Sequence, residues 1–341
     1  MNRRVPVTAA RQASSANTLG RTTPLTETAY RIELKPPDIT AYQSGNTGID
    51  FVTTFDSGKS GPHVLVNALT HGNELCGAIA LDFLFRQGVR PVRGKLTLCF
   101  ANVAAYQCFD ASRPGASRFV DEDFNRVWSL QVLDGPRNSV ELTRARALRP
   151  LYATTDLLLD LHSMQHATPP LVLCGMTRRG RQLAQAVRVP KWIVSDSGHA
   201  SGRRLLDYAG FADADSAKTA LLAECGQHWE RAAADVAIQV TLRFLMATGA
   251  VDPEIVATHL EPEPPPEQKV IEITDAVTMR GSNLVYVADY VGMEIIERKG
   301  TLIARDDSTE IRTPYDNCVL IMPSRRLRRG QTAVRLGRIV S

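Results

Sequence analysis

The sequence lacks several patterns by which protein classes are often recognised. Its six cysteines form no Cys-x-x-Cys pair, which excludes the thiolate zinc fingers. It contains neither the Gly-x-Ser-x-Gly elbow of serine hydrolases nor the His-Glu-x-x-His helix of many metalloproteases. The segment SGKS at 57–60 resembles the end of a phosphate-binding loop, but Thr53 stands where the first glycine should be. These absences exclude several common hydrolase and nucleotide-binding motifs.

Long apolar runs are also missing. No stretch approaches the roughly 18 apolar residues that a membrane helix needs. Residues 1–25 contain no apolar core of a secretory signal, and we expect them to be flexible. Several of the scattered cysteines lie within apolar runs, which suits a reducing compartment. We therefore expect a cytoplasmic protein without a membrane partner.

The excess of positive charge is small. The formal net charge is +4 over 341 residues, and arginine supplies most of the basic side chains. The densest basic cluster, SRRLRRGQTAVRLGR at 324–338, lacks the interleaved aromatic residues of a nucleic-acid groove. We therefore expect no nucleic-acid partner. The 44% hydrophobic content suffices for one sizeable core and a second small one.

Short apolar runs alternate with helical patterns through most of the chain. The runs predict buried strands, and segments with apolar residues on one face predict helices. The predicted strands are 63–70, 94–103, 156–163, 171–176, 191–196 and 219–226, and the predicted helices are 74–88, 139–155, 178–188 and 231–249. Such alternation is typical of an α/β fold whose mostly parallel sheet is covered by helices on both faces.

The pattern changes at the segment HLEPEPPPEQ, residues 259–268. Its prolines and glutamates predict an extended linker. The sequence beyond it is β-like, with short apolar runs separated by Gly, Asp, Asn and Pro. We predict a catalytic α/β domain over 1–258 and a small β domain over 269–341.

Histidine and glutamate residues occur where the predicted strands end. His71 follows the first predicted strand by one residue, and Glu74 begins the next helix. His162 ends the run DLLLDLHS, and Glu224 ends the run TALLAE. In sheets of this kind ligands bind beyond the carboxyl ends of the strands. Because burying these groups together without a metal would be costly, the pattern predicts a metal site.

The residue types favour zinc. Catalytic zinc commonly has two histidines and one glutamate as ligands and keeps a position open for water. His71, Glu74 and His162 can supply that set, which predicts one Zn²⁺ per chain, although affinity alone does not decide which divalent metal is bound in the cell. Asp160 is a secondary candidate for orienting the site. Glu224 also has an ordinary interpretation as a strand-end carboxylate.

A second group of polar residues lies in RFVDEDFNRVW, residues 118–128. Its ordinary interpretation is a charged loop with local turn hydrogen bonds. Its functional interpretation is carboxylate recognition by Asn125 and Arg126, because arginine binds carboxylates through two parallel hydrogen bonds. Arg118 could lie at the metal and stabilise a developing oxyanion.

The motifs HGNE at 71–74, RFVDEDFNR at 118–126, DLHS at 160–163 and ECG at 224–226 occur in an order that resembles the succinylglutamate desuccinylase/aspartoacylase family. That family is similar in fold to the zinc carboxypeptidases, and a small β domain after the linker is typical of it. The resemblance implies a mononuclear zinc amidohydrolase, a deacylase that cleaves an N-acyl amino acid or a related small amide bearing a carboxylate. By position it assigns the zinc ligands to His71, Glu74 and His162, the general base to Glu224, the carbonyl-polarising role to Arg118 and the carboxylate clamp to Asn125 and Arg126.

The sequence departs from the family pattern around Glu224. The segment before it has no evident counterpart of the arginine with which aspartoacylases hold the aspartate side chain, and Arg203 and Arg204 cannot be aligned with it. ECGQHW replaces the residues expected after the base. His199 and His228 are candidates for the pocket lining, with an uninvolved surface histidine as the more ordinary interpretation. The acyl group and the amino acid therefore stay open.

Two other functions stay open. A metallocarboxypeptidase would share the fold and the metal site but trim peptides, and a small β domain that narrows the cleft argues against it. A silent metal-binding protein would need a defect in the ligands or the base, and the sequence shows none. The natural substrate, the pathway and the role of the C-terminal domain are not determined by the sequence, which is also compatible with a homo-oligomer.

Overall fold

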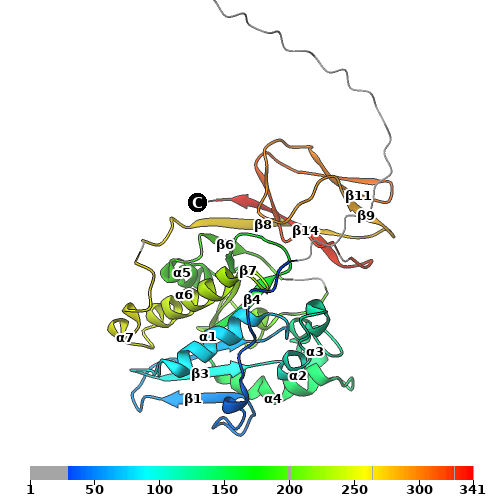
Figure 1. The fold of residues 1–341 in the computed structure, drawn as a ribbon. Helices are drawn as coiled ribbons and strands as arrows, with labels where there is room; N and C mark the ends of the chain where they lie inside the picture. The colour runs from blue at the N-terminus through cyan, green and yellow to red at the C-terminus, as the bar shows by residue number, and fades with distance from the viewer. Residues whose placement is uncertain (1–29, 199–200, 263, 326, 341) are drawn as a thin grey trace, which may run out of the picture. The chain divides into compact units, whose positions relative to one another are not determined.

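One mixed sheet of eleven strands runs through the protein, as a computed structural model that describes residues 30–198, 201–262, 264–325 and 327–340 shows (Figure 1). The predicted flexible segment 1–25 lies outside the described residues. From one edge to the other, the strands are β1 (Val52–Asp56), β3 (Lys95–Phe100), β2 (His63–Ala68), β4 (Leu157–Met164), β7 (Thr219–Gln227), β5 (Leu171–Leu173), β6 (Trp192–Ser195), β8 (Lys269–Thr278), β14 (Thr332–Ile339), β13 (Cys318–Ile321) and β10 (Ile295–Ile296).

The middle of the sheet is mostly parallel. β3, β2, β4 and β7 pair in parallel, and so do β5, β6 and β8. β5 runs antiparallel to β7, as do β1 to β3 and the C-terminal strands to one another. Every residue of β7 is buried, as expected for a strand covered on both faces. The predicted fold class, α/β with a mostly parallel mixed sheet and a C-terminal β region, is confirmed.

Helices cover both faces of this part of the sheet. The α-helices are α1 (Leu75–Arg86), α2 (Val103–Gln107), α3 (Leu130–Leu133), α4 (Val140–Thr154), α5 (Arg178–Val187), α6 (Arg231–Ala247) and α7 (Pro253–Ala257). Short 3₁₀ helices are η1 (Thr40–Tyr42), η2 (Pro114–Ser117), η3 (Phe124–Arg126) and η4 (Leu205–Asp207). α1 and α5 both pack against α6 (Figure 1). α4 lies over the other face, where Tyr152 donates a hydrogen bond to Oδ1 of Asn67 on β2 at 2.7 Å.

The alternation of side chains decides which residues of β4 reach each face. Leu161 faces α1, because a Cβ built on Gly77 would lie 3.0 Å from the Leu161 Cβ. Leu158, Asp160 and His162 therefore point to the other face, toward α4. Leu158 belongs to the apolar core there. Asp160 and His162 are the polar residues that follow on the same face of β4, toward the end of the strand.

The C-terminal strands extend the same sheet. β8 pairs in parallel with β6, and β14 pairs with β8 over most of its length. A separate sheet of β9 (Leu284–Tyr286), β11 (Leu302–Asp306) and β12 (Thr309–Arg312) encloses a second, smaller core with β13 and β14. The described residues from Arg31 onward form one compact unit. Division into two domains at 259–268 stays a prediction, since the sheet crosses that boundary.

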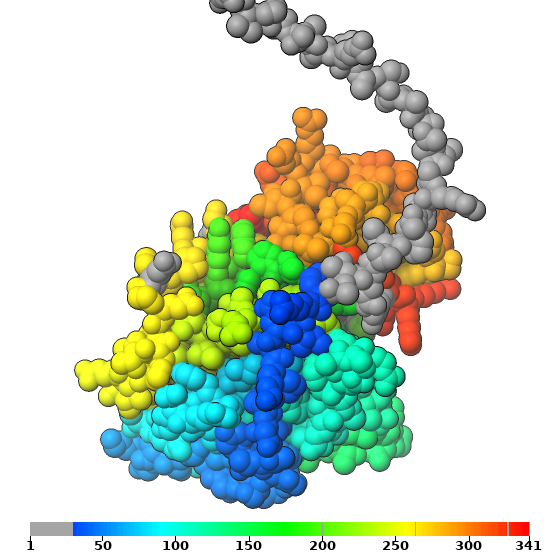
Figure 2. Space-filling view, in the orientation of Figure 1, coloured from blue at the N-terminus to red at the C-terminus, as the bar shows by residue number. Residues whose placement is uncertain are grey.

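Residues 31–39, which precede η1, lie on the surface of the α/β region. Figure 2 shows this segment in dark blue across the outside of the molecule. The backbone N–H groups of Glu33 and Leu34 donate to the carbonyl of Trp229, at 2.9 and 3.2 Å. These two hydrogen bonds anchor the segment beside the start of α6. Among the described residues, no helix has both the length and the apolar character to cross a membrane.

The continuity of the sheet makes a prediction about truncation. A chain that ends at residue 268 should aggregate or melt at a lower temperature than the full chain, because β6 becomes an exposed edge. Size-exclusion chromatography and thermal unfolding measure this. As a control, a full chain cut by a protease within 259–268 should elute as one species, since β8 stays paired with β6. A truncated chain that is monomeric and as stable as the full chain would show that 1–258 folds as an independent domain.

Candidate metal centre

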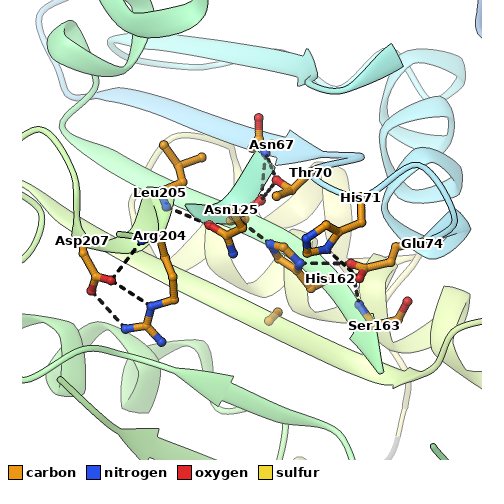
Figure 3. Close-up of polar contacts among 12 residues, drawn as sticks. Asn67, Thr70, His71, Glu74, Asn125, His162, Ser163, Arg204, Leu205 and Asp207 are labelled. Atoms are coloured by element: carbon orange, nitrogen blue, oxygen red, sulfur yellow. Dashed lines mark hydrogen bonds and ion pairs between the residues drawn. The ribbon is translucent and has the colours of Figure 1, made fainter. Parts of the chain in front are cut away.

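The structure brings His71, Glu74 and His162 together. Each can offer one ligand atom such that all three atoms lie within 4.8 Å of one another. Nδ1 of His71 lies 2.8 Å from Oε1 of Glu74, and Nδ1 of His162 lies 3.0 Å from Oε2. In Figure 3 both imidazoles point toward the Glu74 carboxylate. All three side chains are buried.

The turn after β2 delivers two of these side chains. Leu69 adopts a left-handed conformation with φ of 61°, a strain that surrounding packing can hold at functional sites. A Cβ at Gly72 would lie 2.3 Å from the Ala105 carbonyl carbon and 2.5 Å from the Ser117 carbonyl oxygen. Glycine is therefore required where α2 and η2 approach. The Glu74 N–H donates to the His71 carbonyl at 3.2 Å, which closes the turn as α1 begins.

A second carboxylate lies behind each imidazole. Nε2 of His71 is 2.9 Å from Oδ1 of Asp123, and Nε2 of His162 is 2.8 Å from Oδ2 of Asp160. Metal-bound histidines usually donate their other ring N–H to a carboxylate or carbonyl, which fixes the tautomer and the ring orientation. Asp160, a secondary candidate from the sequence, lies in that position. No separate role for Asp123 was predicted from the sequence.

Asp160 is itself held inside the protein. Asn67 donates to its Oδ1 at 2.8 Å, and Thr70 donates to the same oxygen at 2.9 Å. Tyr152 of α4 in turn donates to Asn67. These buried hydrogen bonds satisfy the carboxylate that orients His162. The network links β2, β4 and α4 behind the centre.

Charges within the centre shift its pKa values. Burial alone would raise the pKa of Glu74, but His71 and His162 outweigh it and lower that pKa well below its ordinary value. Burial disfavours the charged form of His162, but Asp160 and Glu74 outweigh it and raise the pKa well above its ordinary value. The centre is therefore strongly polar inside an apolar surrounding.

A divalent metal fits this donor set. Two imidazole Nδ1 atoms and one carboxylate converge, and the second nitrogen of each imidazole already faces a carboxylate. Two histidines and one glutamate are a common ligand set for catalytic zinc. His71, Glu74 and His162 are thus a buried group that could hold a metal ion.

Glu224 lies next to His162 on the neighbouring strand. The two residues are directly paired between β4 and β7, and the register shifts immediately after them, where Gly226 has φ of 124°. Such irregularities often occur beside active sites, where they redirect a side chain. Oε2 of Glu224 is buried without a hydrogen-bond partner among the described residues. Burial raises the pKa of Glu224 to about 8, although His162 acts in the opposite direction.

Arg118 reaches the centre from the loop before η3. Its guanidinium lies 3.3 Å from Oε1 of Glu74 and 3.2 Å from Oδ2 of Asp123. Its side chain is 36% exposed, so part of Arg118 is accessible from solvent. Arg118 therefore combines a contact to the predicted ligand set with access to an incoming molecule.

Asn125 and Arg126 are near the centre but differ in what they can bind. Asn125 is buried, and its Oδ1 accepts a hydrogen bond from the Leu205 N–H at 2.8 Å, as Figure 3 shows. Its amide nitrogen is the group left to donate. Arg126 donates to the Asn125 carbonyl at 2.7 Å and makes no ion pair within the described residues. Burial lowers the pKa of Arg126, as expected for a cation without a direct carboxylate partner.

The guanidinium of Arg204 is already paired with carboxylates of the protein. Its guanidinium makes two hydrogen bonds to Asp196, at 3.0 and 2.8 Å, and further ones to Asp207 (Figure 3). Arg203 is exposed and donates to the Asp207 carbonyl at 3.2 Å. Neither arginine is thus placed as an unoccupied carboxylate receptor. Arg335 of β14 lies 3.4 Å from Asp196, a contribution that nothing in the sequence signals.

His228 is buried, so the surface interpretation of this histidine is wrong. Its Nδ1 lies 2.9 Å from Oγ of Ser163, the residue that follows His162. The signal in the sequence was its position four residues after Glu224, at the end of the same strand. His199, the other pocket candidate, lies outside the described residues.

The chain is similar to proteins of one family in both sequence and fold. A sequence model of the succinylglutamate desuccinylase/aspartoacylase catalytic domain matches residues 60–244. A search of curated proteins by sequence found no match. The structure of succinylglutamate desuccinylase from Vibrio cholerae matches with a TM-score of 0.64 at 16% identity, covering 85% of this chain and 86% of that chain.

Two further solved structures illustrate the range of similar proteins. An aspartoacylase family protein from Mesorhizobium loti has a TM-score of 0.57 at 18% identity, with 85% of this chain and 89% of that chain covered. The product-bound ectoine utilization protein EutE from Ruegeria pomeroyi has a TM-score of 0.56 at 17% identity, with 84% and 88% covered. At such identities these structures show a common fold.

Glu141 holds the loop that carries Arg118 and Arg126, a role that the sequence does not reveal. This carboxylate is fully buried at the start of α4. It accepts hydrogen bonds from the backbone N–H groups of residues 120–122, at 2.7 to 3.2 Å, and from Asn102 at 3.1 Å. No arginine or lysine pairs with it among the described residues. Its negative charge is therefore compensated by backbone dipoles of the loop.

Replacing Glu141 should destabilise the protein and disorder this loop. Glu141→Ala should cost about 2 to 4 kcal/mol of unfolding free energy, because it leaves several buried N–H groups without acceptors. Glu141→Gln should cost less but still be destabilising, since its NH₂ group would face other donors. Urea denaturation measures both. The exposed Glu254→Ala serves as the control. Equal midpoints for Glu141→Ala and wild type would contradict this role.

Proposed function

The chain belongs to the succinylglutamate desuccinylase/aspartoacylase family, and from this premise we propose that it is a zinc-dependent hydrolase of an N-acyl amino acid or a related small amide that bears a carboxylate. The family indicates a hydrolase acting on amides. The observation that carries the finer proposal is the buried triad of His71, Glu74 and His162. Glu224 lies beside it, with no hydrogen-bond partner for Oε2 among the residues described.

His71, Glu74 and His162 would hold one zinc ion per chain, with Asp123 and Asp160 orienting the imidazoles. When bound, zinc lowers the pKa of a coordinated water to near 7 and polarises a carbonyl oxygen. The buried position of the three side chains supports binding without competition from bulk water.

Glu224 acts as the general base and then as the general acid. Its carboxylate accepts a proton from the water that attacks the amide carbonyl. It then gives the proton to the departing nitrogen, because an amine leaves poorly unless it is protonated. The position of Glu224 opposite His162 in the sheet supports this role. So does its Oε2 atom, which has no hydrogen-bond partner in the part of the chain that the structure describes.

Arg118 stabilises the negative charge that develops on the carbonyl oxygen. A donor already held beside the ligand set needs little rearrangement when that charge forms. Arg126, assisted by the Asn125 amide nitrogen, binds the substrate carboxylate and so holds the amide in register. Arg126 makes no direct ion pair with any residue that the structure describes, which supports this assignment.

The remaining expectations stay predictions. They are a small carboxylate-bearing substrate, no nucleic-acid or membrane partner and a cytoplasmic location. The chain is also compatible with a homo-oligomer. A metallocarboxypeptidase and a silent metal-binding protein are the alternatives. Both are decided by the experiments below.

Glu224→Gln should retain metal and lose hydrolysis. The amide keeps the shape of the side chain but cannot accept the proton, so kcat/KM should fall at least a hundredfold. The assay uses a panel of N-acyl amino acids and short peptides, with zinc measured by elemental analysis. Glu254→Gln, which lies on the surface, is the matched control and should behave as wild type.

The outcome on this panel separates the alternatives. Wild-type cleavage of peptides in preference to N-acyl amino acids would favour the carboxypeptidase. A metal-loaded wild type that cleaves neither would favour the silent binding protein. Hydrolysis by Glu224→Gln at the wild-type rate would remove Glu224 from the mechanism.

His162→Ala should lower zinc occupancy sharply. It removes one ligand and leaves Asp160 without the imidazole that it orients, and loss of a ligand from a three-ligand site weakens binding. Elemental analysis after dialysis gives the stoichiometry. His259→Ala, whose ring packs against Phe83, is the control and should keep one zinc per chain. An unchanged stoichiometry in His162→Ala would refute the ligand assignment.

A further inference from the structure

The backbone of the metal-ligand turn, residues 71–74, is hydrogen-bonded to a tryptophan from another part of the chain. The indole Nε1–H of Trp229 donates to the Asn73 carbonyl at 3.2 Å. The N–H of the same peptide unit, which belongs to Glu74, donates to the His71 carbonyl at 3.2 Å. Both polar ends of the Asn73–Glu74 peptide are therefore engaged. This constrains the direction in which the Glu74 side chain leaves the backbone.

Helix α2 contacts the same turn one residue earlier. A Cβ at Gly72 would lie 2.4 Å from the backbone nitrogen of Tyr106, so the helix and the turn are in direct contact. Tyr106 is 7% exposed, and Trp229 is 8% exposed. Two nearly buried aromatic residues thus lie against adjacent residues of the turn, Trp229 through its indole and Tyr106 through its backbone.

The surface segment that we call the N-terminal strap, residues 31–39, binds Trp229. The N–H groups of Glu33 and Leu34 donate to the Trp229 carbonyl at 2.9 and 3.2 Å. Oε2 of Glu33 also accepts a hydrogen bond at 3.0 Å from the N–H of Arg231, where α6 begins. The strap therefore holds the backbone of the residue whose side chain holds the turn.

The same strap binds Tyr106. The Tyr106 hydroxyl donates to the Pro37 carbonyl at 2.6 Å. Pro36 and Pro37 restrict the backbone of the strap, because proline fixes its own φ and disfavours a helical conformation in the residue before it. Leu34 and Ile39 are buried toward either end. The strap thus joins Trp229 to Tyr106 across the outside of the molecule (Figure 2).

We propose that the N-terminal strap holds the metal-ligand turn through Trp229 and Tyr106, which are positioning residues for Glu74. The proposal rests on the metal site of the proposed function. A turn that is already held loses little conformational freedom when its side chains bind an ion, so binding is stronger. The strap therefore slows the release of the metal without contacting it.

The test measures how fast zinc leaves the full-length protein. Zinc-loaded protein is mixed with an excess of a colorimetric chelator, well below the melting temperature of every variant. Trp229→Phe removes the indole N–H, Tyr106→Phe removes only the hydroxyl, and Leu34→Ser removes a buried apolar anchor of the strap. Each should release zinc about two- to tenfold faster than the wild type, as the loss of one hydrogen bond or a comparable contact allows.

Three matched variants control for the chemical change itself. Tyr286→Phe also removes a hydroxyl that donates to a backbone carbonyl, that of Ala333, at 2.7 Å. Trp192→Phe makes the same change as Trp229→Phe on the partly buried β6, and Lys35→Ser alters the exposed neighbour of Leu34. All three should release zinc at the wild-type rate.

Two further measurements separate positioning from a general loss of stability. Tyr106→Phe should add little to Leu34→Ser in the double variant, because both changes loosen the same strap. Cobalt(II) in place of zinc gives visible absorption bands that depend on the ligand geometry. These bands should change in Trp229→Phe and stay as in the wild type in Trp192→Phe.

Four results would overturn the role of the strap. The strap variants and the wild type could release zinc at one rate, or the strap and control variants could release it equally fast. The effects of Leu34→Ser and Tyr106→Phe could add in full, which would show that they act separately. Each of these results leaves the proposed function standing. A wild type that retains no zinc after loading and dialysis would remove the metal site and the strap proposal together.

Discussion

A buried carboxylate, that of Glu74, is the constraint on which the centre depends. A carboxylate inside a protein is stable only when cations or hydrogen-bond donors compensate it. Here His71 and His162 each face one oxygen, Arg118 approaches one, and the Ser163 N–H donates to the other. The groups that stabilise Glu74 are those that would bind a metal or touch a substrate. The fold therefore cannot bury Glu74 without assembling the site.

The arrangement of the sheet and its covering helix provides hydrogen-bond partners for these buried polar side chains. Leu158, Asp160 and His162 alternate on one face of β4, so an apolar core residue is followed by two polar ones along the strand. Asn67 and Tyr152 then complete the hydrogen bonds of Asp160. The transition from core to site occurs within a few residues of one strand. A helix, α4, serves both parts, because its Tyr152 lies in the core and bonds to the network.

The sequence predicted the features of the site that depend on the local pattern of apolar and polar residues. The strand ends at His71, His162 and Glu224 and the helix start at Glu74 follow from hydrophobic runs and their boundaries, and the structure brings these residues together. The sequence did not predict how the neighbouring loop is held. Glu141 accepts hydrogen bonds from backbone N–H groups of the loop that carries Arg118 and Arg126, and no motif predicts a contact of that kind. For His228 the sequence left both a pocket position and an uninvolved surface position open, because a lone histidine carries no periodic signal. Its burial involves contacts with the neighbouring strand, because its backbone N–H donates to the Met164 carbonyl and its Nδ1 lies 2.9 Å from Oγ of Ser163.

Asp196 links the C-terminal strands to the arginines near the site. Asp196, which follows β6, accepts two hydrogen bonds from Arg204 and lies 3.4 Å from Arg335 on β14. Within a buried cluster of this kind, removing one partner leaves an uncompensated charge, so the three side chains stabilise one another. A substrate carboxylate could pair with Arg204 only by displacing Asp196 or Asp207. Arg126, whose charge no direct ion pair neutralises among the described residues, does not face that competition. Under the proposed function, these internal aspartates leave Arg126 as the residue that binds the substrate carboxylate, and Arg335 of β14 helps to hold Asp196 in place.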